Sequence, residues 1–121
     1  RRYGLHKDGC QYVCADDADG MAVETLDGEG FLAVNGTQTL SHTIGALMPE
    51  LEGLRETGIE NFRLWPHAID MVAVAQIFRD LLDGKKAADE AWRGLADIAD
   101  FAPFSNGFYH DGEGAALVRQ A

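Results

Sequence analysis

NFRLWPHAIDMVAVAQIFRDLL, residues 61–82, contains a short apolar stretch, a proline and then a longer amphipathic stretch. Residues 61–65 have the pattern of a short β-strand, and Pro66 ends it because proline has no N–H for a strand's hydrogen-bond ladder. Apolar residues then recur at helical spacing over residues 68–82, with the polar residues on one stripe. This stretch therefore predicts a strand followed directly by a helix.

The same order of elements precedes this stretch. Residues 31–34 form a continuous apolar run bounded by glycines, which predicts a buried strand. Apolar residues at helical spacing follow; Pro49 places the start of the regular helix near residue 48, and Gly58 marks its end. Residues 87–99 are a third helical segment. Two successive strand–helix units are typical of a parallel sheet.

The length of the chain limits how such a sheet is completed. The chain has 121 residues, whereas a complete (β/α)8 barrel takes about 250 residues. Parallel strands also need both faces covered and several neighbours. We therefore expect an α/β fold that is the C-terminal part of a (β/α) barrel-like domain, with parallel strands and flanking helices. Residues 1–121 are then a single partial domain, cut from a longer protein, that aggregates or stays molten alone because its strands have open edges.

The two ends of the chain have the composition of loops. Residues 1–20 mix glycine, aspartate and both cysteines, and predict a cysteine-bearing loop. Residues 21–26 alternate loosely between apolar and polar side chains. Residues 101–121 are glycine-rich with a few aromatic anchors, and predict a C-terminal loop segment.

The chain is strongly acidic. It has 20 Asp and Glu against 10 Lys and Arg, a net charge of −10. Such a charge repels phosphate backbones and anionic lipid headgroups. No apolar run approaches the roughly 20 residues needed to span a bilayer. We therefore expect no nucleic-acid partner and no membrane insertion.

The two cysteines, Cys10 and Cys14, are separated by three residues. This spacing leaves three interpretations open: structural or incidental cysteines, ligands of a metal or cluster, and redox-active thiols. Two thiolates do not complete a tetrahedral or iron–sulfur site, so a ligand role requires further ligands from elsewhere. His6 is either a third ligand or an ordinary histidine of a surface loop.

Other polar side chains follow the predicted strands. Residues 35–41, NGTQTLS, are either a βα turn that caps the next helix or a binding loop. His67 follows the second predicted strand, where barrel enzymes place functional groups. Ser41 and His42 are adjacent but lack a nucleophile motif and an orienting acid. The acidic run at residues 16–19 lacks the ligand spacing of a calcium loop.

Four segments together resemble one protein family. They are GLHKDGCQYVC at residues 4–14, AVNGTQTLS at 33–41, FRLWPH at 62–67 and SNGFY at 105–109. The set is similar to the C-terminal portion of the UbiV-like (YhbV-like) ubiquinone biosynthesis group of the collagenase-like peptidase superfamily. Its most specific element is K-D-x-C-x-x-x-C followed by N-G-x-Q-T-x-S, and this cysteine pair favours the UbiV-like group over the related UbiU branch.

The resemblance implies a barrel-like fold and a 4Fe-4S cluster held by four cysteines. Cys10 and Cys14 match two of these metal ligands, and the other two are expected upstream of Arg1. The implied role is oxygen-independent hydroxylation in ubiquinone biosynthesis. The resemblance also implies a heterodimer with a UbiU-like subunit, a lipid-binding accessory protein as a further partner, and a quinone precursor as the molecule that is hydroxylated. Because thiolate ligation suits a reducing compartment, we expect a cytoplasmic location.

The resemblance assigns no catalytic residue. Candidates for substrate contact or for contacts around the cluster are Lys7, Asn35, Gln38, Ser41 and His67. Lys7 and nearby backbone N–H groups are candidates to tune the cluster's potential. Two other functions remain open. One is peptidase activity, the historical label of the superfamily, for which the sequence offers no nucleophile–base–acid set. The other is a cluster-free half-domain with a structural role.

Overall fold

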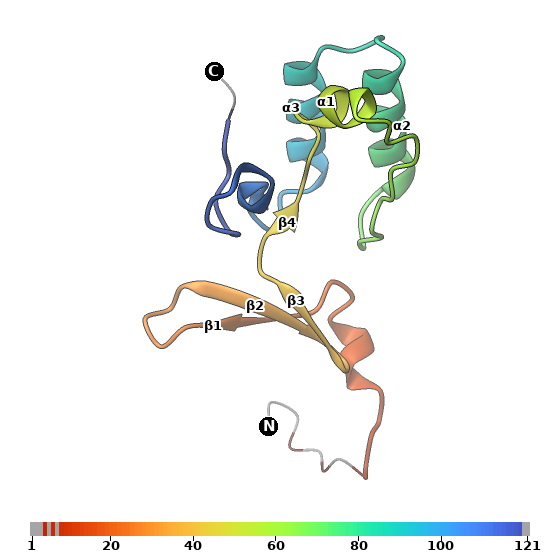
Figure 1. Ribbon diagram of the computed structural model, residues 1–121. Helices are drawn as coiled ribbons and strands as arrows, with labels where there is room; N and C mark the ends of the chain where they lie inside the picture. The colour runs from red at the N-terminus through yellow and green to blue at the C-terminus, as the bar shows by residue number, and fades with distance from the viewer. Residues whose placement is uncertain (1–3, 5, 7, 120–121) are drawn as a thin grey trace. The chain divides into compact units, whose positions relative to one another are not determined.

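The computed structural model describes residues 4, 6 and 8–119, and the chain divides into two compact units. The N-terminal unit comprises residues 1–42 and the C-terminal unit residues 43–121. Figure 1 shows a β-sheet in the first unit and the α-helices in the second. The two units are described separately below.

The N-terminal unit is a three-stranded antiparallel sheet. Its elements are the 3-10 turn η1 (Val13–Asp16) and the strands β1 (Met21–Glu24), β2 (Gly30–Asn35) and β3 (Gln38–Ser41). β2 lies in the middle, with Ala33 opposite Ala22 on one side and Leu40 on the other. None of the residues described in this unit is fully buried. The unit therefore depends on backbone pairing and on half-buried side chains.

Antiparallel pairing corrects the expected parallel sheet. Residues 31–34 do lie in a strand, as predicted, but β2 is joined to β3 by a hairpin. Asn35 pairs with Gln38, and Gly36 at the first position of the turn has a φ of 59°, a conformation that suits glycine. Such a short connection cannot join parallel strands. Of the two interpretations of residues 35–41, the one as a βα turn is therefore wrong.

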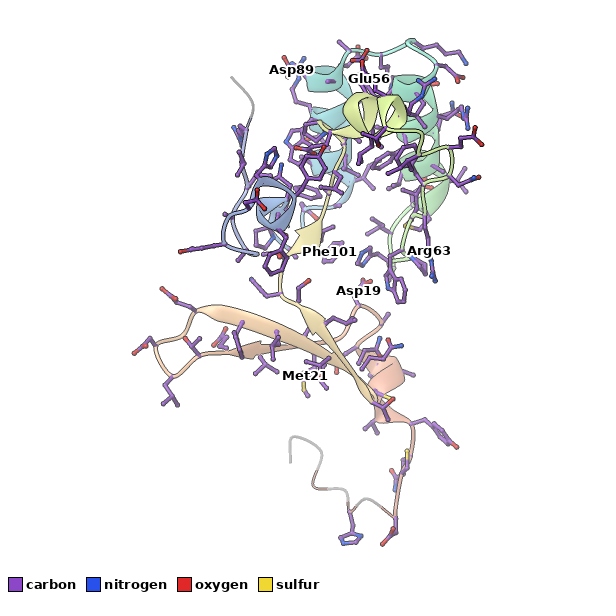
Figure 2. All side chains as sticks on the ribbon, viewed as in Figure 1. Asp19, Met21, Glu56, Arg63, Asp89 and Phe101 are labelled. Carbon is purple, nitrogen blue, oxygen red and sulfur yellow. The ribbon has the colours of Figure 1, made fainter. Side chains whose placement is uncertain are left out.

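The C-terminal unit contains the helices and the core. Its elements are β4 (Ile44–Gly45), α1 (Leu51–Glu56), α2 (Met71–Leu82), α3 (Ala88–Ile98), β5 (Phe104–Ser105) and η2 (Gly107–His110). The core cluster consists of buried side chains of Ala46, Met48, Leu51, Val74, Ile77, Ala91 and Leu95. Side chains converge between the helices, whereas those of the N-terminal sheet project from both of its faces (Figure 2). Hydrophobic burial is thus concentrated in the C-terminal unit.

All three predicted helices are present, in shorter form. α2 begins at Met71 rather than near residue 68 because the Asp70 carboxylate accepts hydrogen bonds from the N–H groups of Val72 and Ala73, at 3.1 and 2.9 Å. This N-cap fixes the first turn of the helix. None of the helices in the described ranges is long and apolar enough to cross a membrane.

The strand predicted at residues 61–65 is absent. These residues form an extended connection, and Phe62 and Leu64 pack their side chains against the core instead of pairing their backbone with a neighbouring strand. The small parallel pair is β4 with β5, in which Ile44 lies opposite Phe104. Over residues 4–119, with residues 5 and 7 left out, the strands close no barrel. Because β5 lies within residues 101–121, this segment is not entirely loop.

Candidate functional site

The two cysteines lie on either side of a sharp turn before the sheet. Both are free thiols; Cys10 is exposed and Cys14, in η1, is partly buried. Tyr12 between them has a left-handed backbone, with φ 54° and ψ 27°, and its N–H donates to the Cys10 Sγ at 3.5 Å. Backbone N–H groups that point at sulfur stabilise thiolate ligands of iron.

Cys14 also lies against the β2–β3 turn. A Cβ built on Gly36 would come within 3.7 Å of the Cys14 Sγ. The Asn35 side chain donates to the carbonyl of Ala18 at 3.1 Å and ties the same turn to the loop after η1. The K-D-x-C-x-x-x-C and N-G-x-Q-T-x-S segments, which carry the family resemblance, are therefore neighbours within the N-terminal unit.

The other candidate residues of this unit are spread over it. Gln38 is exposed on β3, where it pairs with Asn35, and Ser41 ends the same strand. The imidazole of His42 packs so closely over Gly30 that any Cβ there would overlap it. Lys7 lies outside the described residues. Of the candidates that the structure describes in this unit, Asn35 and Gln38 flank the turn that lies against Cys14, and Ser41 lies farther along β3.

His6, considered as a third ligand beside the cysteines, lies next to Asp8 instead. Its Nδ1 lies 3.3 Å from the Asp8 Oδ2, and both side chains are exposed. Within the part of the chain that the structure describes, no three His, Cys, Asp or Glu side chains are grouped to hold a metal ion. Two thiols are half of the donor set of a four-cysteine cluster, so such a cluster would require donors from elsewhere.

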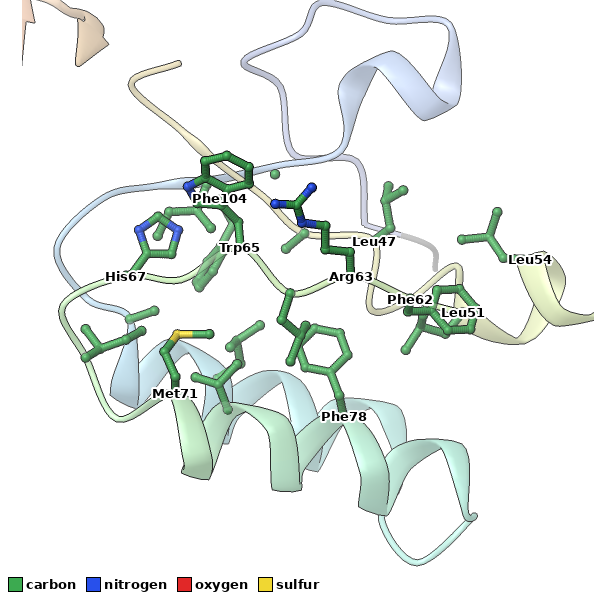
Figure 3. A pocket seen from close by; sticks show the side chains of 18 residues that line it. Leu47, Leu51, Leu54, Phe62, Arg63, Trp65, His67, Met71, Phe78 and Phe104 are labelled. Carbon is green, nitrogen blue, oxygen red and sulfur yellow. The ribbon is translucent and has the colours of Figure 1, made fainter. Parts of the chain in front are cut away.

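A second candidate site is a pocket in the C-terminal unit, with a volume of about 270 Å³ (Figure 3). Its walls come from β4, α1, α2, α3, β5 and the connection at residues 61–69. His67 lines it, with its ring 5.2 Å from that of Phe101. Since residues 61–65 are not a strand, His67 does not follow a strand end as predicted. Its place in the pocket comes from the packing of the connection.

Sequence reasoning missed the charged member of this pocket. The Arg63 guanidinium lies 4.9 Å from the centre of the Trp65 ring, and both residues line the pocket. An arginine over an aromatic face is a cation–π contact. The sequence did contain a signal for this contact: Arg63 and Trp65 are two positions apart in an extended segment, and such residues project to the same side.

A buried polar cluster was also missed. The Glu50 carboxylate is fully buried; its Oε1 accepts from Asn106 Nδ2 at 2.9 Å and lies 2.8 Å from His110 Nε2. Asn106 in turn exchanges two hydrogen bonds with the backbone of Val118, at 2.9 and 2.7 Å. No sequence signal joins Glu50 to His110, which lie 60 positions apart.

The part of the chain that the structure describes thus includes three polar features that a function could use. They are the cysteine turn of the N-terminal unit, the Arg63–Trp65 pocket and the Glu50 cluster. Of these, only the cysteine turn contains residues that the sequence analysis assigned to a cofactor. Comparisons of the chain with protein-family models, with curated proteins and with solved structures found no match.

Proposed function

We propose that this chain is the C-terminal portion of a UbiV-like, barrel-like iron–sulfur protein, in which Cys10 and Cys14 are two of the four ligands of a 4Fe-4S cluster. The observation that supports it best is the cysteine turn. Both thiols are free, three residues including the left-handed Tyr12 separate them, and a backbone N–H points at one sulfur.

The neighbourhood of Cys14 adds support. In a chance resemblance, the two most specific segments would have no reason to meet, yet the Gly36 turn lies against the Cys14 thiol. Gly36 combines a left-handed backbone with this close approach, which explains why glycine suits the position. The remaining two ligands are expected from cysteines upstream of Arg1 in the longer protein, as the resemblance implies.

The proposed role is oxygen-independent hydroxylation in ubiquinone biosynthesis in the cytoplasm. When bound, the cluster would supply electron transfer. The chain's own contribution is to hold two thiolates around the turn at Tyr12 and to donate a backbone N–H to one sulfur, and such hydrogen bonds affect how readily a cluster accepts an electron. A UbiU-like subunit, a lipid-binding accessory protein and a quinone precursor are the proposed partners.

The N-terminal sheet is compatible with such an assembly. Phe31 is 59% exposed, and none of the residues described in this unit is fully buried. A sheet whose apolar side chains are not fully buried within its own unit can pack them against another part of a protein or a partner. The acidic net charge of −10 then keeps the assembly away from anionic lipid headgroups, so a lipid-like substrate would arrive through a partner.

Iron and acid-labile sulfide in the full-length protein test this proposal. The protein is purified and reconstituted without oxygen, as wild type and as Cys10→Ser, Cys14→Ser and Gln11→Ala variants. We expect the wild type and Gln11→Ala to bind equal amounts of iron and sulfide, because Gln11 is exposed beside the thiols but is no ligand. Each serine variant should lose most of both.

Two results would contradict the proposal. One is a colourless, iron-free wild-type protein after anaerobic reconstitution. The other is a cluster that persists unchanged in both serine variants, because four thiolates are needed to hold it. Circular dichroism of every variant shows whether the helices of the C-terminal unit remain intact, so that a loss of iron can be separated from a loss of fold.

A further inference from the structure

The pocket of the C-terminal unit has the size of a site for a small ligand. Its volume is about 270 Å³, whereas apolar cavities of about 150 Å³ already accept a benzene ring. Pockets for drug-sized ligands begin at about 300 Å³. The space therefore suits one ring with a single substituent rather than a larger molecule.

The walls of the pocket favour a flat, apolar ligand. They carry the rings of Phe62, Phe78 and Phe104 together with the indole of Trp65, and aliphatic side chains fill the spaces between them (Figure 3). Aromatic side chains bind another ring by offset stacking or by edge-to-face contact. A planar ring gains more from such walls than a puckered aliphatic ring of the same size.

The charge at the pocket selects the substituent. Arg63 is exposed, lies over the Trp65 ring and lines the pocket. Its guanidinium is a local positive charge beside apolar walls, which can bind an anion at short range although the chain carries a net charge of −10. A guanidinium binds a carboxylate through two parallel hydrogen bonds.

The geometry points to a binding site for a single-ring aromatic carboxylate. The ring would occupy the apolar pocket and the carboxylate would pair with Arg63, beside the Trp65 ring. His67 lines the same pocket and packs against Phe101. This proposal does not rest on the iron–sulfur cluster, because every residue that it uses lies in the C-terminal unit.

Benzoate is the probe for this site. Its binding to the full chain is measured by ligand-observed NMR and by calorimetry, beside benzyl alcohol, which keeps the ring without the charge, and cyclohexanecarboxylate, which keeps the charge without the planar ring. We expect benzoate to bind at least fivefold more tightly than either. Added salt should weaken benzoate binding and leave that of benzyl alcohol unchanged, because only the carboxylate pair is screened.

Arginine variants separate the site from a general affinity for anions. Arg63→Gln should weaken benzoate binding at least tenfold and leave benzyl alcohol binding unchanged. The matched control is Arg93→Gln on α3, an exposed arginine that bonds the carbonyl of Asp89 in its own helix and does not line the pocket. It should bind benzoate like the wild type. Trp65→Leu should weaken both aromatic ligands.

The proposal fails if benzoate shows no binding, or if benzyl alcohol and cyclohexanecarboxylate bind as tightly as benzoate. Equal effects of Arg63→Gln and Arg93→Gln would also overturn it. Benzyl alcohol serves as the folding control, because its unchanged binding to Arg63→Gln shows that the apolar pocket is intact. Cys10→Ser should leave benzoate binding unchanged, which keeps this test separate from that of the cluster.

Discussion

Glu50 illustrates how one carboxylate joins two distant segments of the chain. Its side chain is fully buried at the start of α1, and its Oε1 contacts both Asn106 and His110. The Oε2 of the same group is buried and has no hydrogen-bond partner among the described residues. Because removing one member of a buried hydrogen-bonded group leaves its partners unsatisfied, the cost exceeds that of losing a hydrogen bond at the surface.

Replacing Glu50 should therefore destabilise the C-terminal unit. We expect Glu50→Ala to lower the free energy of unfolding by about 3 kcal/mol, since it leaves Asn106 and His110 without their shared acceptor. Glu52→Ala, at an exposed position in the first turn of α1, should change it by less than about 0.5 kcal/mol. Urea unfolding followed by the helical circular dichroism signal measures both. Equal midpoints for the two variants would contradict a structural role for Glu50.

At this scale, the sequence was most informative about the cysteines. Two thiols at a spacing of three residues are visible in the chain, and the structure adds that Cys14 lies against Gly36. Glu50, His110 and Arg63 were not predicted as site residues, because their roles depend on contacts made only after folding. A buried glutamate at a helix start has the same local pattern as an exposed one.

For the helices and strands, the hydrophobic periodicity of the sequence predicted which elements are present better than it predicted how the strands pair. The three helices follow from their apolar stripes, and α2 begins where Asp70 caps it. β2 was found from its apolar run, but an apolar run does not distinguish a parallel from an antiparallel neighbour. The Asn35-Gly36 dipeptide was the better signal, because it is typical of hairpin turns. Residues 61–65 show the converse, with strand-like composition and no pairing partner.

The end of α2 carries a charge cluster with a predictable pH dependence. Hydrogen bonds from Lys85 and Arg79 to the carboxylate, at 3.0 and 3.2 Å, hold the pKa of Asp83 below its ordinary value of 3.8. A carboxyl group whose pKa is lower in the folded state stabilises the fold above its ordinary pKa. That contribution is lost as the pH falls through the lowered value.

Asp83→Asn should accordingly lower the thermal midpoint slightly at about pH 7, and its effect should shrink as the pH falls below 3.8 and the wild-type carboxylate becomes protonated. The effect at neutral pH is small because the pair faces solvent, and added salt should reduce it further. Asp97→Asn on α3 is the control, as an exposed aspartate without an ion pair in the described structure. A difference for Asp83→Asn that grows at acid pH would contradict this assignment.

Across the whole molecule, burial is uneven. The core cluster lies entirely in the C-terminal unit, and none of the residues described in the N-terminal unit is fully buried. Opening free energies of backbone amides follow the number of buried apolar contacts around them. The helices and the sheet should therefore differ in how long their amides resist exchange.

Hydrogen exchange with mass spectrometry tests this difference in the 121-residue chain. We expect amides of β1, β2 and β3 to exchange at least tenfold faster than those of α2 and α3, because backbone pairing alone protects a three-stranded sheet only weakly. Within the sheet, β2 should be the slowest strand since it has a neighbour on each side. If the amides of β2 exchanged as slowly as those of α2, the sheet would have to be stabilised by more than its backbone hydrogen bonds.

The unburied sheet also bears on the lifetime of the protein in a cell. A unit that opens readily presents extended backbone to proteases, and its rate of degradation follows the population of the open form. Any partner or cofactor that binds only the closed form lowers that population by mass action. The abundance of the chain would then depend on the supply of such a partner or cofactor. Copies of the chain made in excess of it would be degraded.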